Sequence, residues 1–152
     1  MTQSICEQVI QAVMTTLTPV AVAAKATLIR SPTDPLSREQ TPALLVFIDG
    51  ETILESTNNV VKRTLNVTLV AVARATGAGV TTARNEADAL LVAAHAALYE
   101  STALKAVAGY KNLPVEMSTD ETVRKQEAIC LSLQKNYQLT YMTRRNSIST
   151  PA

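Results

Sequence analysis

Two long segments of the chain alternate between apolar and polar side chains with a period of two. In residues 61–73, Val, Leu and Ala share one face while Lys, Thr and Asn share the other. In residues 127–141, Ile, Leu and Tyr alternate with Ser, Gln, Asn and Thr. Because successive side chains of a strand point to opposite faces, this pattern predicts strands of an antiparallel sheet that has one face in water.

The length of these two segments is unusual for a small domain. At about 3.3 Å per residue they would run roughly 43 and 50 Å. A compact chain of 152 residues has a radius of gyration near ~15 Å and a diameter of about 38 Å. Straight strands would overshoot such a domain, so they either bend or project beyond it and offer surface to another copy.

Two amphipathic helices are predicted. The first covers residues 4–17, because Ser4 and Glu7 form a capping box, apolar residues then recur at helical spacing, and Pro19 ends the pattern. The second covers residues 81–100 and begins at one of two threonines. Its apolar stripe is expected to be buried and consists of Ala83, Ala87, Leu90, Leu91, Ala94 and Leu98.

Shorter strands are predicted before the first long one. Residues 20–30 are rich in Ala and Val and close on an apolar run that indicates a strand. Residues 43–48 form a continuous apolar strand that stops at Asp49-Gly50, a pair that predicts a tight turn. Residues 56–59 predict a second turn just before the first long strand.

Polar segments complete the predicted organisation. Residues 31–42 hold three prolines among charged residues and predict an exposed arm. Residues 110–114 predict a turn or short strand, and residues 144–152 predict a flexible tail. The predicted architecture is a single α+β domain over residues 1–143, with a largely antiparallel sheet of long strands, an N-terminal helix and one long helix packed on the sheet.

Composition and charge narrow the classes of function. The formal net charge of +1 gives no overall attraction to nucleic acid. Cys6 and Cys130 are too few for a disulfide framework or a zinc site, and we expect both to be buried in a reducing compartment. We expect no secretory signal near the first residue, and the apolar run at residues 19–29 is too short to span a membrane, so the chain should be cytoplasmic.

Catalytic chemistry finds little support in the sequence. His95 is the single histidine and lies among alanines, so we expect a flank or core position rather than a catalytic or metal site. Gly77 and Gly79 lie between a strand and a helix, where glycine loops can bind phosphate, but Thr82 stands where the nucleotide fingerprint has its third glycine. We expect no catalytic residue, metal or cofactor. A small nucleotide-binding domain that uses Gly77 to Gly79 is the less favoured alternative.

The order of these elements resembles the tail terminator proteins of long-tailed bacteriophages, the group of the lambda minor tail protein U. The resemblance covers nearly the whole chain as a pattern of elements. The segments that carry it are the apolar strand at residues 42–48, the alternating strand at 65–70, the helix at 87–91, the segment 104–110 and the final strand at 128–141.

The resemblance implies a structural role without enzymatic activity. In that family, subunits close into a six-membered ring on the finished tail tube, which stops polymerisation and gives the head connector a surface to join. The implied partners are other copies of this chain in a homo-hexameric ring, the tail tube protein, and a head connector or head-completion protein. No membrane and no sequence-specific nucleic acid is implied, because the genome passes through the ring lumen.

The expected location is the tail or neck of a virion, with assembly in the host cytoplasm. An alternative within the structural class is another neck component, such as a head-completion or connector protein. We expect the ring interface to use the strand around residues 61–68 and the long helix of a neighbour, while the 31–42 arm, the Asp49-Gly50 turn and the end of the final strand reach axial partners. The candidate interface residues are Arg38, Asp49, Gly50, Lys62, Arg63, Thr64, Asn66, Thr68, Arg144 and Arg145.

Overall fold

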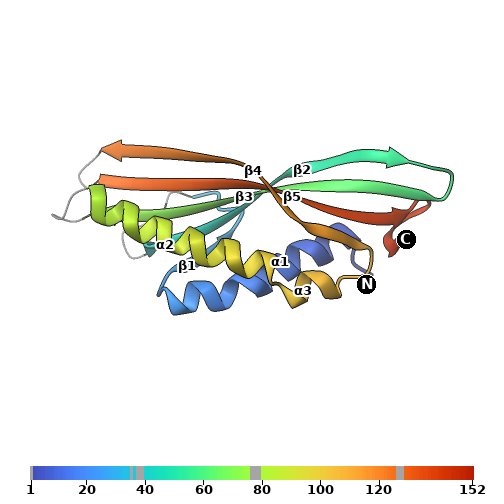
Figure 1. The fold of residues 1–152 in the computed structure, drawn as a ribbon, viewed down its shortest axis with the longest axis horizontal. Coiled ribbons are helices and arrows are strands. Elements are labelled where there is room, and N and C mark those ends of the chain that lie inside the picture. Colours follow the sequence, from blue (N-terminus) through green and yellow to red (C-terminus); the bar gives the residue numbers. More distant parts are fainter. Residues whose placement is uncertain (1, 35, 37–39, 76–79, 126–128) are drawn as a thin grey trace.

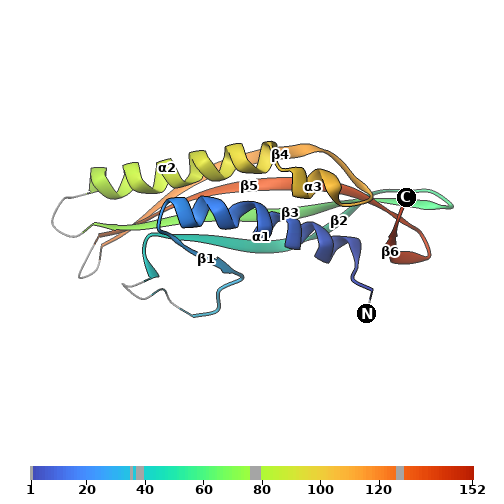
Figure 2. The ribbon, with the colours of Figure 1, turned by 90° about the horizontal axis from the view of Figure 1, so that it is seen from below.

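The protein folds into one long sheet with helices on one of its faces (Figures 1 and 2). The computed structural model describes residues 2–34, 36, 40–75, 80–125 and 129–152. The elements in chain order are α1 (Ile5–Ala23), β1 (Thr27–Arg30), β2 (Ala43–Ser56), β3 (Val60–Ala75), α2 (Val80–Tyr99), α3 (Thr102–Ala106), β4 (Tyr110–Lys125), β5 (Ile129–Arg144) and β6 (Ser147–Pro151).

The strand order is β1-β2-β3-β5-β4, and β6 pairs with the far end of β5. Only β1 and β2 are parallel, and the other pairs are antiparallel. The α+β class with long, mostly antiparallel strands is therefore confirmed. The two alternating segments form the central pair, whose register is continuous from Val60 opposite Arg144 to Ala75 opposite Ile129. Lys135 thus interrupts the apolar face of β5 without any bulge against β3, and Asn136 lies on the opposite face.

Helix α1 begins as predicted but ends later. The Ser4 hydroxyl accepts a hydrogen bond from the Glu7 backbone N–H at 3.1 Å. The predicted end at Pro19 is wrong, because the helix continues to Ala23 and the strand expected from residue 20 starts only at Thr27. Pro19 is exposed and removes one hydrogen bond, whereas Ala21 beyond it is buried. Burial of the following turn keeps it helical.

Helix α1 is also apolar enough, by length and composition alone, to span a membrane, with a mean hydropathy of 1.3. One whole stripe of it packs against the sheet and α2, which is the behaviour of a core helix. The buried residues of this stripe are Ile5, Val9, Ile10, Ala12, Val13, Leu17 and Ala21.

Helix α2 buries the stripe predicted for it. All six residues of that stripe are at most 3% exposed. The helix starts at Val80, so Thr81 and Thr82 lie in its first turn rather than at the cap. The end of β3 beneath it is also covered on the opposite face of the sheet. There Leu36 of the predicted arm packs with Phe47 and Val70 onto a small cluster of Ala43, Leu45 and Val72.

Strand β2 runs straight through the position where the tight turn was predicted. Ile48 pairs with Val67 and Gly50 pairs with Asn66, so Asp49 is the extra residue of a β-bulge. Gly50 has a φ of +116°, which a residue with a Cβ rarely adopts. The prediction of a tight turn at Asp49-Gly50 is therefore wrong. The hairpin turn follows Ser56, where the second turn was expected.

Two strands were not expected from the sequence. Residues 110–125 form the edge strand β4 instead of a turn followed by a polar segment. The segment predicted as a flexible tail also differs, because β5 extends through Arg144 and residues 147–151 form β6. Gly109, with a φ of +88°, lies where β4 and β6 meet on the same edge of β5.

The sheet extends beyond its own helical layer. The β2–β3 hairpin and the β5–β6 turn project past α1 and α3 at one end of the molecule (Figures 1 and 2). The accessible surface is 8458 Å², whereas a compact monomer of this mass exposes about 7,500 Å². Of the two outcomes expected for the long strands, projection is the one observed. We call this projecting end, residues 51–59 and 144–146, the sheet tip.

Candidate interaction surfaces

The structure divides the predicted interface residues among three places. Lys62, Thr64, Asn66 and Thr68 lie on the face of β3 that no helix covers, and Arg63 lies on the helix side. Asp49 and Gly50 lie in the β2 bulge, and Arg144 and Arg145 lie at the sheet tip. Arg38 lies outside the described residues.

The helix-free face carries a ladder of polar side chains across three strands and the β2 bulge. The Thr68 hydroxyl on β3 hydrogen-bonds to the Asp49 carboxylate and lies 2.6 Å from Oδ1 of Asn136 on β5. Asn136 in turn donates from Nδ2 to the Ser118 hydroxyl on β4. The Asp49 bulge therefore places a carboxylate within reach of the sheet centre, which stabilises this face and leaves it hydrophilic.

A second polar cluster lies on the helix side, where the sheet tip leaves the helical layer. Arg63 donates from Nη1 to Oε1 of Glu51 at 2.7 Å and from Nε to the Thr143 hydroxyl at 3.2 Å. Burial raises the pKa of the Glu51 carboxyl, but hydrogen bonds from Tyr141, Arg63 and Cys6 outweigh it and hold the pKa below its ordinary value. The cluster fixes the direction in which the sheet tip projects.

Cys6 belongs to this cluster. It is partly rather than fully buried, which differs from the expectation of a buried thiol. Burial raises its pKa, and the neighbouring Glu51 carboxylate raises it further, so the thiol is protonated and unreactive at neutral pH. The side chain of Cys130 is outside the described set.

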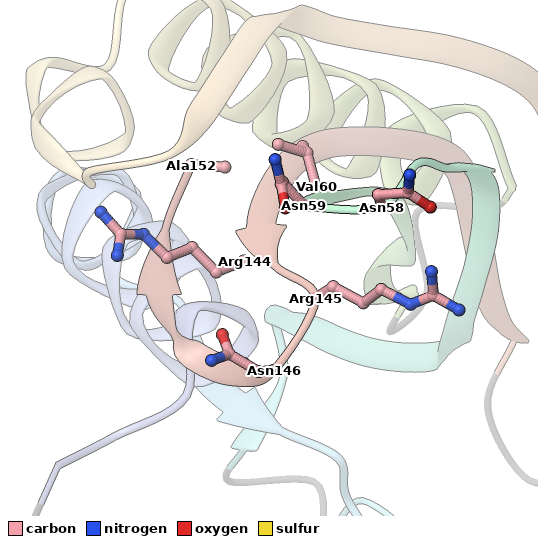
Figure 3. A pocket seen from close by; sticks show the side chains of 7 residues that line it. All are labelled: Asn58, Asn59, Val60, Arg144, Arg145, Asn146 and Ala152. Carbon is pink, nitrogen blue, oxygen red and sulfur yellow. The ribbon is translucent and has the colours of Figure 1, made fainter.

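The sheet tip carries an open basic hollow of about 770 Å³ (Figure 3). Its lining residues come from the β2–β3 turn and the β5–β6 turn and are Asn58, Asn59, Val60, Arg144, Arg145, Asn146 and Ala152. The Arg145 backbone N–H donates to the Asn59 carbonyl at 3.0 Å, which joins the two turns. The two guanidinium groups point away from each other and, within the described part of the chain, neither has an ion-pair partner. The tip can therefore contact an acidic surface.

Sequence reasoning missed the apolar part of the sheet tip. Ile53 is 58% exposed and Leu54 is 54% exposed. A second register shift lies between Ile53 and Glu55 and makes Leu54 the extra residue of another bulge. The sequence did contain one sign of this apolar surface, because Ile53 and Leu54 are adjacent large apolar residues between polar neighbours.

A groove in the helical layer was also missed, and we call it the helix groove. It lies between the last turns of α1 and the middle of α2 and has a volume of about 520 Å³. Its lining is almost entirely apolar, with one carboxylate, and consists of Pro19, Val20, Ala23, Ala24, Glu86, Ala89, Leu90 and Ala93. Small side chains on both helices open this groove, and the alanine-rich stretches of the sequence are its only sign.

His95 occupies a half-exposed flank position, as expected. Its Nδ1 lies 2.7 Å from the Tyr137 hydroxyl and 3.8 Å from Glu116 Oε2, and its ring packs on Tyr99 with centroids 4.6 Å apart. Glu116 also accepts a hydrogen bond from Lys135 at 2.7 Å. These contacts hold α2 and β4 against β5. Lys135 interrupts the apolar helix side of β5, and the ion pair with Glu116 neutralises its charge there.

Metal-binding groups are not found among the described residues, where no three His, Cys, Asp or Glu side chains converge. The Gly77 to Gly79 segment, which carried the nucleotide-binding alternative, lies outside the described residues.

Comparisons with known proteins do not assign a family. No protein family and no curated protein matches the chain. A chain of a solved structure described as the virion of a native gene transfer agent particle superposes with a TM-score of 0.48 and 12% sequence identity. The superposition covers 90% of this chain and 92% of that chain. A likeness at this level does not decide what the chain does.

Proposed function

We propose that the protein is a structural protein of a phage-like virion, and specifically a tail terminator that caps the tail tube as a homo-hexameric ring. The observation that carries the proposal is the projection of the sheet beyond its own helices. A ring of identical subunits needs two different surfaces on each subunit, because every contact is head to tail. The sheet tip and the helical layer are two such surfaces.

The element order supports the same proposal. The segments that resemble the terminator family form parts of β2, β3, α2 and β5 and the passage from α3 to the start of β4, so the resemblance maps onto the sheet and the helices that cover it. The middle of the helix-free face, around Asp49 and Asn136, is hydrophilic and suits a wet surface, such as the lumen through which a genome passes. In this proposal the protein acts by assembly alone and needs no cofactor.

Axial contacts complete the proposed role. We assign the tail tube and the head connector, or a head-completion protein, to surfaces that the ring contacts leave free. The arm that carries Leu36 and the bulge at Asp49 are candidates, because both lie on the helix-free side of the sheet. Arg144 and Arg145 point away from each other, so one can face an acidic axial partner while the other faces a neighbouring copy (Figure 3).

Electron microscopy of particles made without this protein tests the proposal. A terminator is indicated by overlong tails that are detached from heads. Tails of normal length together with heads that leak their genome would contradict it and favour a head-completion or connector protein. Normal infectious particles would remove both neck roles.

A charge-reversal variant refines the test. Arg144→Glu combined with Arg145→Glu should fold normally, because both side chains are exposed and unpaired within the described part of the chain. It should weaken attachment to tail or head. Assembly of normal particles by this variant would contradict the proposal that the two arginines contribute to attachment.

A further inference from the structure

We infer that the sheet tip of one copy docks into the helix groove of the next copy, with Ile53 and Leu54 as its apolar anchors. The inference rests on the proposed function, because it names the junction that would close the ring. It commits to a second copy of this chain as the occupant of the groove.

The apolar anchors are left largely uncovered by their own subunit. Ile53 and Leu54 are each more than half exposed, and residues 49–59 around them are all exposed. Adjacent large apolar residues on a projecting hairpin leave apolar surface in water, and burial of that surface against a partner is favourable. Such residues mark contact sites when a matching apolar surface exists.

The helix groove supplies a surface of matching chemistry. Its apolar lining consists of Leu90, Val20, Pro19 and four alanines. Two further valines on the same helices are highly exposed, Val22 at 72% and Val92 at 61%, so apolar surface extends beyond the groove itself. Branched aliphatic side chains from a partner would remove this surface from water.

Charge is complementary between the two surfaces. The sheet tip carries Arg144 and Arg145 without ion-pair partners in the described part of the chain, since Lys62 faces Glu55 and Arg63 binds Glu51. The helix groove carries one carboxylate, Glu86, which likewise has no ion-pair partner among the described residues. An arginine at the rim of the docked tip would meet this carboxylate, which favours the correct orientation.

The two surfaces lie far apart along the long axis of the molecule. The β2–β3 hairpin projects at one end, while the last turns of α1 and the middle of α2 lie beyond the centre, toward the other end (Figures 1 and 2). A contact between them cannot be satisfied within one subunit. It is head to tail and leaves one free tip and one free groove at the two ends of any open row of copies, so no surface is left over only when a ring closes.

The exposed edge of β4 is the competing surface. Leu113, Val115 and Met117 are exposed there. Pro114 and two register shifts interrupt this edge, which is how natural sheets prevent pairing with another chain. It therefore provides a control site rather than the junction.

Complementary variants test the junction. Leu54→Asp puts a charge on the anchor and leaves the groove intact, and Ala89→Arg fills the groove and leaves the tip intact. Both positions are exposed, so folding should survive, and circular dichroism checks it. Each variant alone should assemble about tenfold or more weakly than the wild type, measured by sedimentation with tail tubes present as template. Leu113→Asp should assemble as the wild type does.

A mixture of the two variants gives the sharper result. Only one junction can form between them, from the intact tip of the Ala89→Arg chain to the intact groove of the Leu54→Asp chain. We expect pairs and no rings. Rings in the mixture, no pairs at all, or either single variant assembling as the wild type would overturn the inference.

Cross-linking in assembled particles gives a readout that is independent of self-association in solution. A chain with Leu54→Cys and Ala89→Cys, in which Cys6 and Cys130 are replaced by Ala, should give a ladder of covalent oligomers when treated with a short bis-maleimide. A chain that carries only one of the two introduced cysteines should not. Absence of the ladder in particles that contain the protein overturns the junction. Overlong, detached tails in the absence of the protein would still support the terminator role, so the two failures are distinguishable.

Discussion

Arg63 on β3 and Glu51 on β2 form an ion pair with an Nη1 to Oε1 distance of 2.7 Å, at the level where the sheet leaves its helical layer. Arg63 also reaches Thr143 on β5, so one guanidinium joins three neighbouring strands. The side chain of Arg63 is only 17% exposed, and its charge is therefore weakly screened by water.

Arg63→Met should lower the free energy of unfolding by about 1–3 kcal/mol, because Glu51 and Thr143 lose a charged hydrogen-bond donor in a partly buried place. Urea denaturation at pH 7 measures it. Arg145→Met is the matched control. It removes an exposed arginine that has no partner among the described residues and should change stability by at most about 0.5 kcal/mol. Equal losses in the two variants would contradict a role for the Arg63 pair.

Glu7→Gln should remove part of the acid sensitivity of the fold. Hydrogen bonds from Arg30 and Gln11 lower the pKa of Glu7 from 4.5 to about 2. Since the folded-state pKa is the lower one, the pair stabilises the fold above pH 4.5, and this contribution is lost as the pH falls toward 2.

The pair is about one-third exposed, so its contribution at pH 7 should be only about 0.2–1 kcal/mol. Urea denaturation of the wild type and of Glu7→Gln at pH 7, 4.5 and 2.5 measures the difference between them. That difference should be largest at pH 7 and shrink as the pH is lowered. A constant difference would show that the carboxylate charge is not responsible.

Two tyrosine variants should shift stability in opposite directions. Tyr137→Phe removes the hydroxyl that lies 2.7 Å from His95 Nδ1 and should cost about 0.5–1.5 kcal/mol. The Tyr110 hydroxyl is buried without a hydrogen-bond partner in the structure, and burial raises its pKa to about 12. Tyr110→Phe should therefore be neutral or stabilising. Thermal unfolding of both variants measures this, and a clear loss in Tyr110→Phe would indicate that its hydroxyl does have a partner.

The sequence predicted the elements that bury one face in their own subunit. The stripe of α2 was predictable because Leu90, Leu91 and Leu98 recur with alanines at helical spacing and all meet the sheet. Strand β4 was not, because it is an edge strand in which exposed Leu113, Val115 and Met117 replace a buried apolar face.

Tertiary pairing overrode two local signals. Asp49-Gly50 is a strong turn signal, yet pairing of Gly50 with Asn66 absorbs it as a bulge inside β2. Pro19 signals a helix end, yet burial of Ala21 carries α1 onward. The apolar sheet tip and the helix groove were not predictable either, because apolar residues that wait for a partner give no periodic pattern within one chain.

Gly109→Ala should be among the most damaging single changes outside the core. A Cβ at this position would lie 2.6 Å from the Met142 carbonyl oxygen and 3.0 Å from the Pro151 Cβ, and the φ of +88° is itself strained for alanine. Gly50→Ala is the matched control, because its φ of +116° is also positive but no atom lies within 4 Å.

Gly50→Ala should lower the free energy of unfolding by about 1–3 kcal/mol through backbone strain alone. Gly109→Ala should cost more, because the backbone of β5 or the C-terminal strand β6 must also shift. Hydrogen exchange should then show faster exchange at Met142, whose N–H donates to the Gly109 carbonyl at 2.8 Å. Equal stability of the two variants, with unchanged exchange at Met142, would contradict the close approach of Gly109 to β5 and β6 in the structure.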